Sequence, residues 1–224
     1  DHLALANRNG QLYILEMDGD LKTRVELGGV APGPPGRHRG RLFFTLDRGK
    51  LVAVERGAVA WVYPGPGGGS SAYPAVDGAG GVYMGLDDGT VVALTRDGKP
   101  RWRVVVTPAA APKDRTKSKP VADKTSLAPG AILGAMAITG GKGEEIMLVL
   151  ATAGGEVIAL ARGDGKELWR QRAGVANGGL AALGDGGVVL GTEAGLILAL
   201  DSQGKVRWKL QADGAVRGTP TVSG

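Results

Sequence analysis

All four tryptophans of this chain occupy the same position in one repeated pattern. Each tryptophan follows a turn glycine by four residues, and these pairs recur along the 224-residue chain. The pairs are Gly57 and Trp61, Gly98 and Trp102, Gly165 and Trp169, and Gly204 and Trp208. A short repeated unit cannot bury its apolar surface alone, so it must pack against the neighbouring units. This pattern therefore constrains the fold more than any other feature of the sequence.

A second series of glycines gives the length of the repeat. Its members are Gly10, Gly49, Gly89, Gly155 and Gly195. They are about 40 residues apart, except that an insertion at 107–130 separates Gly89 from Gly155 by 66 residues. An alanine follows the glycine by four residues in the last four units (Ala53, Ala93, Ala159 and Ala199). The first unit departs from the pattern, with Ile14 at the alanine position and Thr23 at the tryptophan position.

Short apolar runs alternate with the glycine turns, as in Val188–Thr192 and Leu196–Leu200. Runs of this length that are rich in Val, Leu and Ile predict buried strands. A further short segment precedes each group of three strands: Val30–Pro35, Ala72–Val76, Ala131–Ile138, Leu180–Leu183 and Thr219–Val222. Four strands in about 40 residues is typical of a propeller blade. The sequence thus predicts an all-β protein, a single β-propeller domain over residues 1–224 with five four-stranded blades.

The repeated residues have a structural explanation. Glycine allows the tight turns, and one large side chain per unit supplies burial against the neighbouring blade. We therefore assign structural roles to the repeat residues: Trp61, Trp102, Trp169, Trp208, Gly57, Gly98, Gly165 and Gly204. A row of ligand-stacking rings is the alternative explanation of the tryptophans.

The two ends of the chain suggest a closed ring. The chain starts in the second strand of a blade, Leu3–Ala6, and stops after a first strand, Thr219–Val222. Pairing these strands would complete one blade and remove two exposed sheet edges. A closed ring predicts a monomer. Two alternatives stay open, namely an arc of a larger ring and an open arc completed by another copy.

The segment Ala159–Trp169 (ALARGDGKELW) resembles the tryptophan-docking motif of the PQQ-like (pyrroloquinoline quinone-type) repeat family, Ala-x-Asp-x-x-x-Gly-x-x-x-Trp. The segments Ala199–Trp208 and Ala93–Trp102 are similar but one residue shorter. Asp201 keeps the acidic position, whereas Ala161 and Thr95 depart from it. The resemblance covers the chain outside residues 107–130 and implies a β-propeller.

The resemblance implies different functions for different members of this family. Its quinone-dependent dehydrogenases have eight blades, a longer chain, a vicinal disulfide and a calcium site. This chain has no cysteine and only two histidines, so that activity is not expected. Non-enzymatic members include the propeller lipoprotein of the bacterial outer-membrane β-barrel assembly machinery. The resemblance therefore implies a periplasmic or secreted location.

The sequence contains no recognisable catalytic constellation, and we expect no catalytic residue, no cofactor and no metal site. There is no Gly-x-Ser-x-Gly elbow and no phosphate-binding loop. No apolar run reaches the roughly 18 residues that a membrane helix requires. The net charge of +5 is modest and is not concentrated on a repeated face, so a nucleic-acid partner is not expected.

Function is expected where the repeats differ: in the insertion, in the loop at 31–40 and in the unit with Thr23. The proline-rich, basic insertion and one loop supply the candidate partner-binding residues Lys113, Arg115, Lys117, Lys119, Lys124, Arg37, His38 and Arg39. We predict a non-catalytic scaffold that mediates protein–protein interactions, within a cell-envelope assembly if the family resemblance extends to function. The alternative is a five-bladed propeller that binds or hydrolyses carbohydrate at its central funnel.

Overall fold

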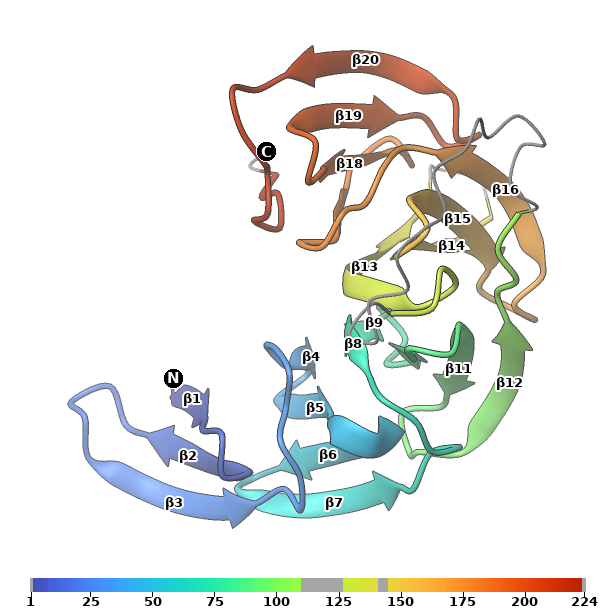
Figure 1. Cartoon of the computed structure of the whole chain (residues 1–224). Coiled ribbons are helices and arrows are strands. Elements are labelled where there is room, and N and C mark those ends of the chain that lie inside the picture. Colours follow the sequence, from blue (N-terminus) through green and yellow to red (C-terminus); the bar gives the residue numbers. More distant parts are fainter. Residues whose placement is uncertain (1, 110–126, 141–144, 223–224) are drawn as a thin grey trace.

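The structure, a computed structural model, describes residues 2–109, 127–140 and 145–222, which form five β-sheets arranged in an arc (Figure 1). The sheets follow one another in chain order, and each is one blade. The helical content of these residues is one short 3-10 turn at Asp47–Gly49, and no helix in them could cross a membrane. The predicted all-β propeller architecture is confirmed.

Four of the five blades have four consecutive antiparallel strands, and the first has three. The first blade contains β1 (Leu3–Ala6), β2 (Gln11–Leu15) and β3 (Leu21–Glu26). The second contains β4 (Gly36–His38), β5 (Arg41–Thr45), β6 (Leu51–Glu55) and β7 (Ala58–Tyr63). The third contains β9 (Ala75–Val76), β10 (Val82–Gly85), β11 (Thr90–Leu94) and β12 (Pro100–Val105). The fourth contains β13 (Ile132–Thr139), β14 (Met147–Thr152), β15 (Glu156–Ala161) and β16 (Glu167–Arg172). The fifth contains β17 (Leu180–Ala182), β18 (Val188–Gly191), β19 (Leu196–Leu200) and β20 (Val206–Gln211).

The middle strands are apolar on both faces because a neighbouring blade covers each face. In β6, Leu51 and Ala53 pack toward the third blade, whereas Val52 and Val54 pack toward the first. The buried apolar residues accordingly form four clusters, one at each junction between successive blades. The core of the protein is therefore a series of junctions rather than one central volume.

The alanine of each repeat lies directly opposite the tryptophan on the neighbouring strand. The cross-strand pairs are Ala53 with Trp61, Ala93 with Trp102, Ala159 with Trp169 and Ala199 with Trp208. A register shift follows the alanine in every case. A small side chain opposite a large one leaves room for the indole ring on the crowded face, since side chains of such pairs interact directly.

Three of the indole rings lie on the turn glycine of the next blade. A Cβ atom at Gly98 would be 2.7 Å from the Trp61 ring, and one at Gly165 would be 2.7 Å from the Trp102 ring. The Trp169 ring covers Gly204 in the same way, at 2.6 Å. The indole N–H groups donate to carbonyl oxygens of these turns: Trp61 to Arg96 (3.0 Å), Trp102 to Arg162 (2.9 Å) and Trp169 to Ser202 (2.9 Å). Trp208, on the last strand of the arc, is half exposed.

The expected ring closure is not formed by the described residues. Residues 219–222 adopt no strand, and β1 pairs only with β2. The chain before this segment folds back on its own blade, where the Val216 N–H donates to the Thr192 carbonyl, and the Thr219 hydroxyl donates to the Gly178 carbonyl. Each junction fixes the step between blades, and the steps present here leave the first and last blades apart (Figure 1).

Prolines displace two of the expected inner strands. The segment Val30–Pro35 forms no strand, and the inner strand of the second blade is β4, which starts after Pro35. Pro74 divides the expected strand Ala72–Val76 into β8 (Ser71–Tyr73) and β9. Strand β8 pairs in parallel with β13 of the fourth blade, while β9 pairs with β10 of the third. Proline lacks the N–H group that a strand interior needs, so the pairing changes there.

Gly165→Ala should destabilise the protein by about 2 kcal/mol. Gly165 has a φ of +77° and lies beneath the Trp102 ring, so a methyl group there is strained and displaces the indole. Gly163→Ala is the matched control, since a Cβ at that turn position meets nothing within 4 Å. Chemical denaturation of the two variants measures the effect, and equal stabilities would contradict the docking role of Gly165.

Candidate functional site

The first junction of the arc is built differently from the other three. Ile14 lies opposite Thr23 across β2 and β3, in the positions that alanine and tryptophan occupy elsewhere. Thr23 still lies on the turn glycine of the next blade, because a Cβ at Gly57 would be 2.8 Å from the Thr23 methyl group. A threonine covers much less of that turn than an indole ring would. The exchange therefore keeps the docking position but leaves it underfilled.

A hollow of about 1270 Å³ opens at this junction. The first blade contributes Ile14, Thr23 and residues of β1, and the second blade contributes Leu42, the β4–β5 turn and the β6–β7 turn. The complete lining is His2, Leu3, Ala4, Ile14, Lys22, Thr23, Pro35, Arg37, Gly40, Leu42, Arg56 and Gly57. The repeat pattern indicated the departure at Thr23, but the hollow itself follows only from the assembled blades.

Basic side chains surround the hollow. Lys22 and His2 share one partner, since Glu16 lies 2.9 Å from the Lys22 ammonium and 3.3 Å from the His2 ring. A hydrogen bond from Lys22 lowers the pKa of Glu16. Arg37 and Arg56 form no ion pair with any residue that the structure describes, and both are exposed. The hollow thus presents an excess of positive charge.

The structure separates the three basic residues expected in the loop at 31–40. Arg37 in β4 lines the hollow at the first junction. His38, the next residue, points the other way, because a Cβ at Gly80 in the third blade would be 3.1 Å from its ring. Arg39 lies in the exposed turn with a φ of 44°. Of these three residues, only Arg37 therefore lines the hollow. The hollow also contains Lys22 and Arg56, which the sequence analysis did not identify as candidates.

The other expected partner-binding residues fall within the insertion. Lys113, Arg115, Lys117, Lys119 and Lys124 lie outside the described residues. Their role as a docking segment stays a prediction from composition.

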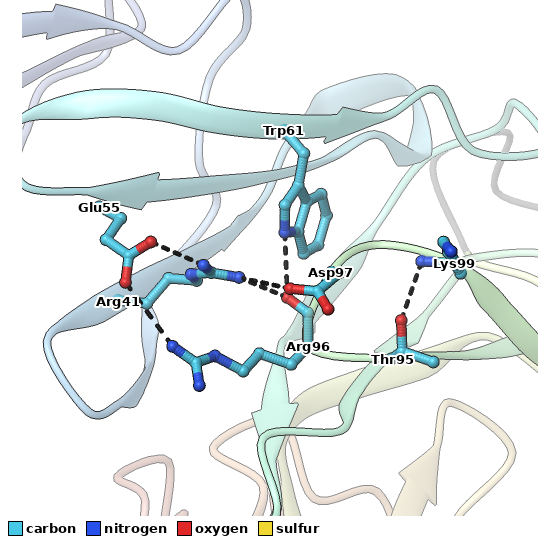
Figure 2. A network of polar contacts seen from close by, with 7 residues as sticks. All are labelled: Arg41, Glu55, Trp61, Thr95, Arg96, Asp97 and Lys99. Atoms are coloured by element: carbon cyan, nitrogen blue, oxygen red, sulfur yellow. Dashed lines mark hydrogen bonds and ion pairs between the residues drawn. The ribbon is translucent and has the colours of Figure 1, made fainter.

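A polar network joins the second and third blades around Arg41 (Figure 2). The buried Arg41 donates to Glu55 at 2.6 Å and to the Arg96 carbonyl at 2.6 Å, and its guanidinium lies 3.5 Å from Asp97. The Arg96 carbonyl also accepts the indole N–H of Trp61, so the guanidinium and the ring are tied to the same turn. The hydrogen bond from Arg41 holds the pKa of Glu55 below its usual value. This network ties the second blade to the turn of the third.

A second network joins the third and fourth blades around Asp77, which is only 4% exposed. Asp77 accepts hydrogen bonds from the N–H of Gly81 (2.8 Å), the hydroxyl of Tyr83 (2.9 Å) and the guanidinium of Arg162 (3.1 Å). Burial alone would raise the pKa of Asp77, but these hydrogen bonds outweigh it and hold the pKa below the usual value. Burial and the hydrogen bond to Asp77 raise the pKa of Tyr83 to about 12.

Both buried carboxylates among the described residues are thus paired with arginine. Asp77 binds Arg162, and Glu156 lies 2.6 Å from Arg170. Within the described ranges, no three His, Asp or Glu side chains gather in a way that could hold a metal ion. The described residues therefore offer no carboxylate pair aimed into a hollow, whereas they do offer a basic, partly apolar surface at the first junction.

The sheet order and the tryptophan-on-glycine junctions define a β-propeller of the PQQ-like class. The family model described as outer membrane protein assembly factor BamB matches residues 4–148 and 153–224. The chain belongs to this family. No curated protein sequence matches the chain.

Solved structures with the same fold have diverse printed descriptions. BamB from Moraxella catarrhalis has a TM-score of 0.57 and 18% identity, covering 100% of this chain and 76% of that one. BBS1N in complex with ARL6DN has a TM-score of 0.57 and 16% identity, covering 96% and 58%. A quinohemoprotein alcohol dehydrogenase from Pseudomonas putida HK5 has a TM-score of 0.64 and 13% identity, covering 94% and 40%. These identities show a shared fold, and the last neighbour shows that the fold also occurs in an enzyme.

Asp77→Asn should lower the free energy of unfolding by about 2 kcal/mol at neutral pH, because Arg162 loses a charged partner. The folded pKa of Asp77 lies below the unfolded value of 3.8. The carboxylate therefore stabilises the fold fully above that value, and its contribution is lost as the pH falls through the folded pKa. The difference in the free energy of unfolding between Asp77→Asn and wild type, measured by denaturation, should become smaller as the pH falls from about 5 to about 2. Asp213→Asn, at an exposed position, is the control; a difference for Asp77→Asn that is independent of pH would contradict the assignment.

Proposed function

We propose that this chain is a non-catalytic binding platform for proteins in a cell-envelope assembly, located in the periplasm or secreted. Membership of the BamB family supports this role, because the family description names an assembly factor. The observation that carries the proposal is the hollow at the first junction, where Arg37 and Arg56 are exposed and form no salt bridge among the described residues. Charged groups of this kind steer and select an acidic protein surface.

The buried acidic groups support a binding role over hydrolysis of carbohydrate. Glycoside hydrolysis requires two carboxyl groups that face one substrate site. Asp77 is instead paired with Arg162 between two blades and Glu156 with Arg170 within one blade, and neither carboxylate lines the hollow. The comparisons likewise do not favour the carbohydrate alternative, since the matched family is described as an assembly factor.

Arg37→Glu should reduce capture of envelope proteins by about fivefold, because it reverses a charge at the rim of the hollow. The measurement immobilises the chain, incubates it with a bacterial envelope extract and quantifies the captured proteins by mass spectrometry. Arg39→Glu makes the same charge change in the adjacent turn, away from the hollow, and should bind like wild type. Equal losses in the two variants, or no specific capture by wild type, would count against the proposal.

The insertion is proposed as a second docking segment for an acidic partner. Replacing residues 110–126 with a short Gly-Ser linker keeps the described contacts at its edges, where the Gly154 N–H donates to the Pro129 carbonyl at 2.7 Å. We expect this variant to capture less protein than wild type in the same assay. The reduction should be larger at low salt than at high salt, because charge attraction is strongest at low salt. Unchanged capture at every salt concentration would discard the docking role and assign the segment to a tolerated loop expansion.

A further inference from the structure

The hollow at the first junction lies where the docking position is occupied by Thr23 instead of an indole. At the other junctions, the accepting carbonyl belongs to the residue three positions after the repeat alanine: Arg96 after Ala93, Arg162 after Ala159 and Ser202 after Ala199. The corresponding residue after Ala53 is Arg56, which lines the hollow. This turn is shorter than the others, because Glu55 pairs with Ala58 and Arg56 has a φ of 51°. Among the described residues no indole donates to this turn, and the Thr23 methyl group alone covers Gly57, so the docking position is only partly filled.

The surroundings of this site determine what could occupy it. Ile14 and Leu42 form apolar walls, and a ring in contact with them would be removed from water, which favours aromatic side chains. Lys22 lies on the first blade, whereas Arg37 and Arg56 lie on the second. Lys22 is already paired with Glu16, whereas Arg37 and Arg56 are exposed and form no salt bridge among the described residues. The positive charge of the second-blade wall therefore favours a ligand with negative groups beside its ring.

The size of the hollow favours a chain segment over a small molecule. Pockets for small ligands are about 300–1000 Å³, and this hollow is about 1270 Å³. A peptide can anchor one aromatic side chain in the docking position and place flanking residues along the basic rim. Such an anchor would contribute most of the binding energy, since buried aromatic side chains dominate interfaces.

We propose that the hollow binds a tryptophan side chain presented by an acidic segment of a partner protein. The partner's indole takes the position that Trp61, Trp102 and Trp169 take at the other junctions, and its acidic residues face Arg37 and Arg56. This inference rests on the proposed function, because it states the chemistry of the protein partner.

The test uses a fluorescein-labelled peptide with one tryptophan between two pairs of acidic residues, and measures binding to the full chain by anisotropy. Wild type should bind it about tenfold more tightly than the same peptide with alanine in place of tryptophan. The double variant Ile14→Ala/Thr23→Trp restores the repeat pattern and fills the hollow from within, so it should bind about tenfold more weakly. Ile14→Ala alone is the control, since it removes the same side chain without filling the site.

Equal binding of the two peptides by wild type, or wild-type affinity in the double variant, would overturn the proposal. Circular dichroism checks that the double variant is folded. If it is not folded, Arg56→Glu serves as the second test and should weaken binding of the tryptophan peptide. Unchanged binding by Arg56→Glu would also overturn the proposal. If N-acetyltryptophanamide binds as tightly as the peptide, the proposed partner segment is wrong and the ligand of the hollow is a small aromatic molecule.

The capture assay separates this inference from the proposed function. If the chain captures envelope proteins and excess tryptophan peptide does not displace them, the proposed function stands and the chemistry proposed for the hollow is wrong. If the peptide binds but no protein is captured, the chemistry of the hollow stands and the proposed function fails.

Discussion

The structure depends on one contact, the packing of an indole ring on the turn glycine of the next blade. The contact combines apolar burial, a hydrogen bond from the ring and a fixed distance, because a side chain at the glycine would collide with the ring. The third and fourth blades carry both halves of the contact, since the glycine of each receives the previous ring and its tryptophan covers the next turn. Successive blades are thereby placed by nearest-neighbour interactions, as in other repeat proteins.

The sequence predicted the parts of the fold that are local to one repeat. The spacing of Gly165 and Trp169 indicates a turn and a docking ring, and both lie within a few residues of each other. The ion pair between Asp77 and Arg162 could not be predicted, because the two residues are 85 positions apart and an arginine–aspartate pair at these two positions does not recur in the other repeats. Closure of the ring is not seen in the described residues, and the sequence could not decide it, because the period of a repeat specifies the size of a blade and not the angle between blades. Thr23 was noted as a departure, yet only the assembled walls reveal the hollow beside it.

The charged residues of this protein divide into two groups with different roles. Buried acids such as Asp77 and Glu156 are held by arginines and hydrogen bonds, so their charges are used within the fold. Arg37 and Arg56 are exposed and form no salt bridge among the described residues. Buried charge pairs thus stabilise the fold, and the exposed cations at the hollow remain available for contacts with another molecule.

The parallel pairing of β8 with β13 has a consequence for cooperativity. Strand β8 precedes the third blade in the chain but is hydrogen-bonded into the sheet of the fourth, so these two blades share backbone bonds as well as side-chain packing. Among the described residues, no strand of the first blade pairs with the sheet of a neighbouring blade, and Thr23 instead of an indole contacts the second blade. In a chain of nearest-neighbour units, opening begins where the coupling is weakest. Local unfolding should therefore start at the first blade, while the third and fourth blades open as one unit.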